Sequence, residues 1–411
     1  MDADIKHWPE GDESEIPFWI YTDKDVYQSE LERIWYGRNW LYAGLEAEIP
    51  EVGSYRTTML GERSVIVVRS AENEVSVLEN RCRHRGVEIC QARGGKVDDI
   101  ICPYHRWSYA LNGALQGVPF RRGIKGKGGM PSDFDPKDHG LKPLKVEVVN
   151  GMIWASFDHD TPPFRECLGE RLWGPYERIV SGRRLRVVGY TRQVIKANWK
   201  LFIENIRDPY HGALLHVFLP TFGLFRPDQN SAILMDDSGA HSCMVSPAPG
   251  GSTGSIDAKD YNFDGSLELA DRRILDAVHE LAGDETLGMV CAFPGVIILQ
   301  QVNALQVRQC VPKGPDEFEL NWTHFGFEDD DAEMRARRVR QANLFGAGGY
   351  VSVDDSEVFA WAQRGYDMTA GEGGALLKMG TGGREITNQD SLATESALRG
   401  MYQYYREVME L

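Results

Sequence analysis

The segment C-R-H-R-G-V-E-I-C-Q-A-R-G-G-K-V-D-D-I-I-C-P-Y-H-R-W, residues 82–107, carries two pairs of side chains that can bind metals. Cys82 and His84 form the first pair, Cys102 and His105 form the second, and seventeen residues lie between the pairs. Two thiolates and two imidazoles suit either zinc or a [2Fe–2S] cluster that has cysteines on one iron and histidines on the other. Each pair mixes the two ligand types, which favours the cluster over zinc.

The residues around this segment form short β-rich runs separated by glycine-bearing turns. S-V-I-V-V-R and E-V-S-V-L-E are typical of strands, so residues 40–157 are predicted to form a small all-β domain. Paired prolines then indicate a linker, which is taken to cover 158–184. Residues 185–411 mix strand and helix patterns and are predicted to form a second domain. Residues 1–39 contain a helical pattern, and we expect this segment to pack with the second domain.

A second candidate metal site lies in D-P-Y-H-G-A-L-L-H, residues 208–216. His211 and His216 are five positions apart, which is about 140° around an ideal α-helix. Both imidazoles reach one metal only if the helix is distorted or one histidine lies near its end. A mononuclear iron site would also need a carboxylate, which a distant acidic residue must supply. The alternative is a pair of structural histidines, which is also the expectation for His324.

These motifs resemble those of Rieske non-haem iron aromatic-ring-hydroxylating oxygenases, in their large (α) subunits. C-x-H-R-G followed by C-P-Y-H is similar to the cluster motif, and D-P-Y-H-G-A-L-L-H is similar to D-x₂-H-x₄-H. F-G-A-G-G-Y-V-S-V-D-D-S is similar to the late acidic pair that follows a glycine-rich turn. Respiratory Rieske proteins add a disulfide at the positions of Val87 and Tyr104, so the chain resembles the oxygenase branch. One departure is Arg106, where the oxygenase motif more often has glycine.

The resemblance implies an α+β fold and a set of ligands. A small all-β Rieske [2Fe–2S] domain would be inserted before a helix-grip-like, antiparallel-sheet catalytic domain with a mononuclear iron. The implied cluster ligands are Cys82, His84, Cys102 and His105. The implied ligands of the mononuclear Fe(II) are His211, His216 and Asp355, with Asp354 as the alternative to Asp355. The alternative role for both acidic residues is capping of a helix N-terminus.

For Asp208 the resemblance implies a role as an electron bridge. In the family this aspartate hydrogen-bonds the second Rieske histidine of a neighbouring subunit, here His105, and the first iron-ligating histidine, here His211. A ring-shaped oligomer is implied, because the two metals of one chain lie too far apart. Asn205 matches a polar position near the iron. The alternative for Asp208 is an ordinary turn residue before Pro209.

The implied function is a terminal oxygenase that hydroxylates an aromatic acid with O₂ and with electrons from NAD(P)H. The chain is most similar to large subunits of the salicylate 5-hydroxylase type, then to terephthalate, anthranilate and halobenzoate enzymes. An indole or arylacetic acid stays open as the substrate. The implied partners are a small β-subunit in an α3β3 assembly and a reductase, with or without a ferredoxin. One-oxygen and two-oxygen insertion use the same ligands, so both remain open.

A substrate with a carboxylate needs a cation in an apolar pocket, and Arg308 is the candidate. It lies in the run V-N-A-L-Q-V-R-Q-C-V among apolar neighbours, where a guanidinium could pair a carboxylate through two hydrogen bonds. The alternative is an arginine in a structural ion pair.

Composition limits the other function classes. The net charge of −16 argues against nucleic-acid binding, which needs a basic surface. The sequence contains neither a basic start with an apolar run nor an apolar stretch of about 20 residues, so we expect neither a secretory signal nor a membrane span. Seven scattered cysteines fit a reducing cytoplasm. Two alternatives stay open, a Rieske electron carrier without oxygenase activity and a zinc-stabilised binding protein.

Overall fold

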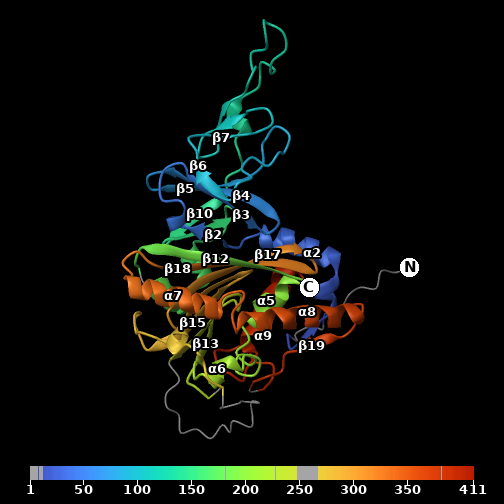
Figure 1. Ribbon diagram of the computed structural model, residues 1–411. Coiled ribbons are helices and arrows are strands. Elements are labelled where there is room, and N and C mark those ends of the chain that lie inside the picture. Colours follow the sequence, from blue (N-terminus) through green and yellow to red (C-terminus); the bar gives the residue numbers. More distant parts are fainter. Residues whose placement is uncertain (1–7, 9–12, 181, 227, 248–266, 381) are drawn as a thin grey trace, which may run out of the picture. The chain divides into compact units, whose positions relative to one another are not determined.

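The computed structural model describes residues 8, 13–180, 182–226, 228–247, 267–380 and 382–411 (Figure 1). These residues form two compact units. The smaller unit runs from Tyr36 to Thr161, and the larger unit combines the segment before it with the chain from Pro162 onward. The predicted α+β architecture, a small β-rich part inserted before a part built on an antiparallel sheet, is confirmed. Within these residues no helix has both the length and the apolar character that crossing a membrane requires.

The smaller unit is built from three antiparallel sheets. A four-stranded sheet has the order β5-β4-β3-β6, and two three-stranded sheets have the orders β10-β11-β2 and β7-β8-β9. Strand β4 contains the β-branched run V-I-V-V, whose side chains are fully buried, so β4 is a central strand. The strands are β2 (Leu41–Leu45), β3 (Ser54–Leu60), β4 (Arg63–Ala71), β5 (Glu74–Glu79), β6 (Gly94–Lys96), β7 (Ile100–Ile101), β8 (Ser108–Tyr109), β9 (Leu115–Gly117), β10 (Lys145–Val149) and β11 (Met152–Ser156). Short 3₁₀ turns lie at Glu46–Glu48 and Pro136–His139.

The larger unit is organised around a seven-stranded antiparallel sheet with the order β12-β18-β17-β16-β15-β14-β13. Its strands are β12 (Leu185–Ile195), β13 (Ala232–Met235), β14 (Ser242–Pro247), β15 (Glu285–Ala292), β16 (Val296–Gln301), β17 (Ala304–Gly314) and β18 (Glu317–Phe327). Strand β17 is buried over most of its length although it contains several polar residues. In the register of β17 with β18, Gln306 lies opposite His324 and Arg308 lies opposite Trp322.

Helices pack against both faces of this sheet, and α7 and α8 can be followed beside it in Figure 1. Helix α4 (Glu170–Val180) covers one face, where Ile179 lies against Gly288. Helices α7 (Ala332–Phe345) and α8 (Ser352–Met368) cover the other face, where the Ser356 hydroxyl on α8 donates a 3.0 Å hydrogen bond to Gln193 Oε1. Alternate residues of a strand point to opposite faces. The face under α7 and α8 therefore carries the side chains of Gln306, Arg308, Trp322 and His324.

Residues 158–184, predicted to be a linker, contain two helices of the larger unit. These are α3 (Phe164–Leu168) and α4, and the α4 side chains Leu172, Tyr176 and Ile179 are completely buried. The second proline of the pair, Pro163, is the N-cap residue of α3. The linker interpretation is corrected on this point, because the paired prolines mark the start of a packed helix.

The N-terminal segment packs within the larger unit. Strand β1 (Glu15–Pro17) pairs with β19 (Gly374–Leu376), and α1 (Trp19–Thr22) and α2 (Lys24–Glu30) lead into a π-helix at Leu31–Trp35. The fully buried carboxylate of Glu30 accepts hydrogen bonds from Lys200 Nζ at 2.5 Å and from the Tyr405 hydroxyl at 2.6 Å. These partners lie on α5 (Trp199–Asn205) and α9 (Ser396–Met409), so one buried network joins three distant parts of the chain.

Candidate active site

Two loops with the same hydrogen-bond pattern carry the four candidate cluster ligands. The Cys82 N–H donates to the carbonyl five residues later at 2.8 Å, and the N–H four residues later donates back to the Cys82 carbonyl at 2.9 Å. Cys102 makes the same two bonds at 2.9 and 3.1 Å. The first loop follows β5 and the second joins β7 to β8, so the small sheets bring both loops to one end of the unit.

The position four residues after each cysteine has a left-handed backbone. It is Gly86 in the first loop, with φ +72°, and Arg106 in the second, with φ +60°. Glycine adopts this conformation without steric cost, whereas an L-residue pays roughly 1–2 kcal/mol. The departure at Arg106 therefore places an unfavourable residue at a position where the fold favours glycine.

Replacing Arg106 with Gly is expected to stabilise the protein against unfolding by up to about 1 kcal/mol, since the left-handed strain exceeds the extra chain entropy of glycine. Thermal melting of the holoprotein, followed through the cluster absorbance, measures the effect. Gly86→Arg is the matched control and is expected to lower the melting temperature. A lower melting temperature for Arg106→Gly would show that the exposed Arg106 side chain makes a compensating interaction.

The two cysteines of these loops are buried and the two histidines lie farther out. Cys82 and Cys102 are 3% and 1% exposed, and the Tyr109 hydroxyl lies 3.2 Å from Cys82 Sγ. Burial raises the pKa of the Cys102 thiol, and the neighbouring Cys82 raises it further. The Nδ1 atoms of His84 and His105 lie 3.1 Å apart. A cysteine pair beside a histidine pair is the donor set of a [2Fe–2S] cluster with mixed ligation, so these residues fit that cluster.

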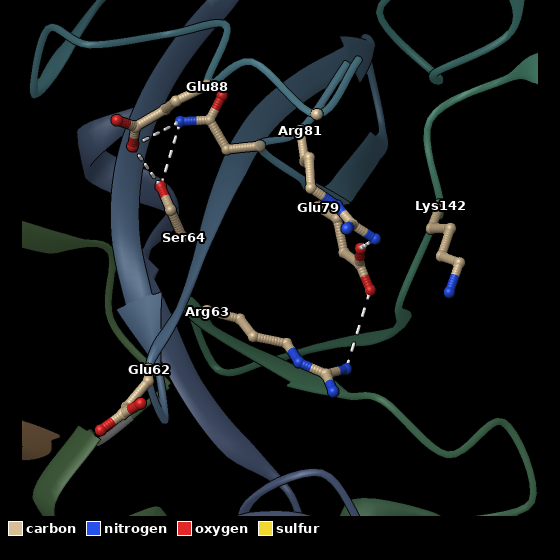
Figure 2. Close-up of a pocket in the computed structure, with 9 residues that line it drawn as sticks. Glu62, Arg63, Ser64, Glu79, Arg81, Glu88 and Lys142 are labelled. Carbon is tan, nitrogen blue, oxygen red and sulfur yellow. Dashed lines mark hydrogen bonds and ion pairs between the residues drawn. The ribbon is translucent and has the colours of Figure 1, made fainter. Parts of the chain in front are cut away.

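Two hollows flank the cluster loops and differ in character. Figure 2 shows the first, a charged cleft of about 410 Å³ in which Arg63 and Arg81 lie 3.8 and 3.5 Å from the Glu79 carboxylate. Lys142 also lines it, and a smaller adjoining hollow extends to Cys82. The second hollow, of about 480 Å³, lies beside the histidines, and its lining includes the exposed rings of Tyr104 and Phe120.

The second candidate centre starts where α5 ends. The residues between α5 and α6 (Phe218–Thr221) form turns, so the ideal-helix angle between His211 and His216 does not apply. Pro209 has no N–H and disfavours a helical conformation for Asp208. Instead, Asp208 Oδ1 accepts the Tyr210 N–H at 2.8 Å. The proline and this turn provide the break in the helix that two histidines five residues apart need.

His211, His216 and Asp355 converge, with one ligand atom of each within 4.8 Å of the others. Asp355 Oδ1 lies 3.2 Å from His216 Nε2 and 3.6 Å from His211 Nε2. Donor atoms that surround one first-row metal at about 2 Å are separated by roughly 3 Å, so the spacing fits a single ion. Two imidazoles and one carboxylate are also the donor set of mononuclear iron sites with open positions. The residues present therefore fit such an iron.

Carboxylates hold the other nitrogen of each histidine. His211 Nδ1 lies 3.1 Å from Asp208 Oδ2, and His216 Nδ1 lies 3.5 Å from Asp354 Oδ2. Such contacts fix the tautomer and aim Nε2 at the metal. Asp355, and not its alternative Asp354, is thus the carboxylate placed between the two Nε2 atoms.

Asn205 joins the centre from the end of α5. Its amide Nδ2 lies 3.0 Å from Asp355 Oδ1 and 3.2 Å from His211 Nε2. Burial lowers the pKa of His211, but the hydrogen bond and charge of Asp208 raise it to a net increase. Burial raises the pKa of Asp355, but both histidines and Asn205 lower it to a net decrease. The site therefore favours an ionised Asp355, the form that binds a cation.

Arg308 is buried on the sheet face under α7 and α8, as a pocket cation would be. Its guanidinium donates to Gln306 Oε1 at 3.2 Å, to Gln301 Oε1 at 3.3 Å and to the Phe345 carbonyl at 3.1 Å. Within the described parts of the chain, no carboxylate lies within ion-pair distance of it, which disfavours the structural ion pair. Gln306 was not predicted from the sequence to be a functional residue, and His324 was predicted to be structural. The sequence signal that could have identified Gln306 is its position two residues before Arg308 in a largely apolar, buried strand.

Comparisons with known proteins place the two units in families. Residues 182–411 match the family described as ring hydroxylating alpha subunit (catalytic domain), and residues 39–127 match the Rieske [2Fe-2S] domain. Among solved structures, naphthalene 1,2-dioxygenase from Rhodococcus sp. bound to indole aligns with a TM-score of 0.80 at 26% identity. This alignment covers 96% of this chain and 94% of that chain.

Curated relatives match over nearly their whole length. The chain is 47% identical to the large oxygenase component of salicylate 5-hydroxylase from Ralstonia sp., over 98% of this chain and 96% of that protein. It is 40% identical to the anthranilate 1,2-dioxygenase large subunit from Burkholderia cepacia, over 99% and 96%. It is 38% identical to the terephthalate 1,2-dioxygenase terminal oxygenase component subunit alpha 2 from Comamonas sp., over 100% and 98%.

Proposed function

Because the chain belongs to the ring-hydroxylating α-subunit family and is a Rieske non-haem iron oxygenase, we propose that it hydroxylates an aromatic acid of the salicylate type with O₂. Arg308 is the main support for an acidic substrate. Its buried guanidinium, on the sheet face below α8, is hydrogen-bonded to neutral acceptors. Burial lowers the pKa of Arg308 to about 10, and Asp355 is the group whose charge opposes this. The Phe345 carbonyl that accepts from Arg308 also accepts from the Ser352 hydroxyl, in the first turn of the helix that carries Asp355.

We assign the cluster to Cys82, His84, Cys102 and His105, and the mononuclear iron to His211, His216 and Asp355. When bound, the cluster supplies single electrons and the iron supplies activation of O₂ at its open positions. The chain's own residues orient the ligands. Asp208 and Asp354 hold the two imidazoles by their Nδ1 atoms, and Asn205 Nδ2 donates to Asp355 Oδ1.

Asp208 is proposed to be the bridge between the two centres, which then belong to different copies of the chain. One of its carboxylate oxygens faces His211 Nδ1. His105 directs Nδ1 toward His84, so the Nε2 of its ring is left on the far side to meet an acceptor on a neighbouring copy. The exposed aromatic rings beside His105 support burial of this face in an assembly. We propose a ring of three α subunits with three small β-subunits.

Electrons are proposed to come from NAD(P)H through a reductase, with or without a ferredoxin. The charged cleft that extends toward Cys82 supports docking of such a carrier near the cluster loops, and acidic and basic side chains both line it (Figure 2). We propose a cytoplasmic location, which the seven cysteines support, because the described residues contain no disulfide.

Replacing Arg308 with Met is expected to raise the KM for salicylate by about 100-fold, because two charge-assisted hydrogen bonds are lost. Steady-state kinetics of the reconstituted system measure this change. Arg308→Lys keeps the positive charge but lacks the planar pair of donors. Its KM for salicylate is expected to lie between those of the wild type and Arg308→Met. An unchanged KM in Arg308→Met, with iron content intact, would exclude Arg308 as the carboxylate site.

The function is tested by product analysis. The anaerobically purified chain is combined with its β-subunit and reductase partners and supplied with NADH, O₂ and salicylate, 2-aminobenzoate, terephthalate or indole-acetate. The proposal expects a ring-hydroxylated product from salicylate. Cluster reduction without any product from these acids, in a sample with full mononuclear iron, would contradict the substrate class.

A further inference from the structure

Three polar side chains gather on one face of the central sheet below α7 and α8. Gln306 and Arg308 are two residues apart on β17, and His324 lies opposite Gln306 on β18. Their exposed fractions are 0% for Gln306, 6% for Arg308 and 3% for His324. Directly opposite residues on neighbouring strands have Cβ atoms about 5 Å apart, so Gln306 and His324 present their side chains to the same space.

Two polar atoms of this cluster have no hydrogen-bond partner among the described residues, Gln306 Nε2 and His324 Nδ1. A buried polar group without a partner costs about 1–3 kcal/mol, and few such groups persist in a native structure without a ligand or water. The opposite ends of both side chains are occupied. Gln306 Oε1 accepts from Arg308 Nε at 3.2 Å, and His324 Nε2 lies 3.0 Å from the Thr191 hydroxyl.

The hydrogen bonds already made by Gln306 and His324 determine whether their unpaired atoms act as donors or as acceptors. Because the guanidinium holds the amide oxygen of Gln306, the amide nitrogen is a donor directed away from Arg308. Burial and the positive charge of Arg308 lower the pKa of His324 to about 4, so its imidazole is neutral near pH 7. A neutral imidazole that donates its Nε2 proton to the Thr191 hydroxyl has a lone pair on Nδ1, which can accept a hydrogen bond. A hydroxyl group offers both a lone pair and a proton and therefore matches the two unpaired atoms together.

The cluster lies beside the iron-site helix. Arg308 donates to the Phe345 carbonyl, and the hydroxyl of Ser352, in the first turn of α8, donates to the same carbonyl at 3.2 Å. Asp355 is one turn further along α8. His324 lies next to Gly346, in the same connection between α7 and α8. A molecule that reaches Arg308 is thus next to both unpaired atoms.

We propose that Gln306 and His324 bind a hydroxyl group on the ring carbon next to the substrate carboxylate, and so select 2-hydroxybenzoates over benzoates without it. The inference rests on the proposed function, in which Arg308 binds the carboxylate. Gln306 donates to the hydroxyl oxygen, and the hydroxyl proton is shared with His324 Nδ1. Gln306 and the guanidinium of Arg308 are in direct contact, so the hydroxyl bound by one and the carboxylate bound by the other must be neighbours. The hydroxyl therefore lies on the ring carbon ortho to the carboxylate. An amino group can donate to His324 but is a poor acceptor for Gln306.

The test measures equilibrium binding and kinetics of three probes, benzoate, 2-aminobenzoate and 2-hydroxybenzoate, to the intact iron-loaded assembly. Binding is measured anaerobically by calorimetry, and kcat and KM are measured separately. The wild type is expected to bind 2-hydroxybenzoate about tenfold or more tighter than benzoate, with 2-aminobenzoate between them. Gln306→Met and His324→Leu are each expected to bring this ratio close to one. His324→Leu should change benzoate binding by less than about threefold, whereas Gln306→Met also removes an acceptor of Arg308 and should weaken all three probes as Gln301→Met does.

Gln301→Met is the matched control, because Gln301 also accepts from Arg308 but its amide nitrogen is not among the unpaired buried atoms. It is expected to weaken all three probes by a similar factor. If one test variant does not assemble with full iron, the other carries the test. An unchanged ratio in a correctly loaded variant overturns the inference, as does a wild type that binds benzoate and 2-hydroxybenzoate equally well. Those two results leave the proposed function intact, whereas a wild type that binds none of the probes overturns both.

Discussion

Replacing Asp208 with Ala is expected to reduce turnover by a factor of about 1,000 or more while the cluster remains fully assembled. Asp208 is not a proposed ligand of either centre, but its carboxylate lies 3.1 Å from His211 Nδ1 and is the proposed contact to His105 of a neighbouring copy. Loss of a carboxylate behind a metal-binding histidine lowers metal affinity by roughly 10–100-fold. Saturating Fe(II) offsets this loss. The remaining defect is then one of electron transfer.

A single-turnover experiment separates this defect from a structural one. The reduced protein, loaded with iron and substrate, is mixed with O₂, and oxidation of the cluster is followed by its absorbance. Asp208→Ala is expected to keep the cluster reduced for far longer than the wild type.

Asp354→Asn is the matched control, because Asp354 lies behind His216 at 3.5 Å in the same way but has no proposed bridging role. It is expected to weaken iron binding and to leave cluster oxidation fast once iron is saturating. Equal rates of cluster oxidation in Asp208→Ala and the wild type would show that electrons take another route.

The four proposed ligands of the cluster could be selected from the sequence because each pair is local. Cys82 with His84, and Cys102 with His105, lie within single loops, so spacing alone reports which atoms can meet. The conformation of the loops was less predictable. Arg106 adopts φ +60° because the hydrogen bonds of its loop require it, although its residue type disfavours that conformation.

The mononuclear centre shows where local reasoning reaches its limit. The angle between His211 and His216 argued against a shared metal only under an ideal helix, and Pro209 removes that helix. The convergence with Asp355 depends on how α8 packs on the sheet, which no local pattern describes. The pairing of Gln306 with His324 depends on the register of β17 and β18, and a shift by one residue would separate them. The Glu30 and Lys200 network joins segments 170 residues apart and is equally non-local.

Replacing Asp355 with Ala is expected to remove the mononuclear iron and leave the cluster untouched. Asp355 is the carboxylate that lies between both Nε2 atoms, so its loss removes one of three ligands and the negative charge that offsets the metal. The affinity for iron should fall by more than roughly 100-fold, which is the upper range for replacing a residue that only hydrogen-bonds a metal ligand. Purified protein should contain about two irons and two sulfides per chain instead of about three and two, with an unchanged EPR signal of the reduced cluster.

The comparison with Asp354→Ala decides which acidic residue is the ligand. Asp354 reaches only the outer nitrogen of His216, at 3.5 Å, and is 41% exposed, so its replacement should retain most of the iron under saturating conditions. Both variants keep the same helix start, because α8 has no side-chain cap at its N-terminus and loses one acidic residue of its first turn in each case. A difference in iron content between them therefore reports ligation and not helix stability. Equal iron loss in both would mean that the two carboxylates share the metal, and retention in Asp355→Ala with loss in Asp354→Ala would reverse the assignment.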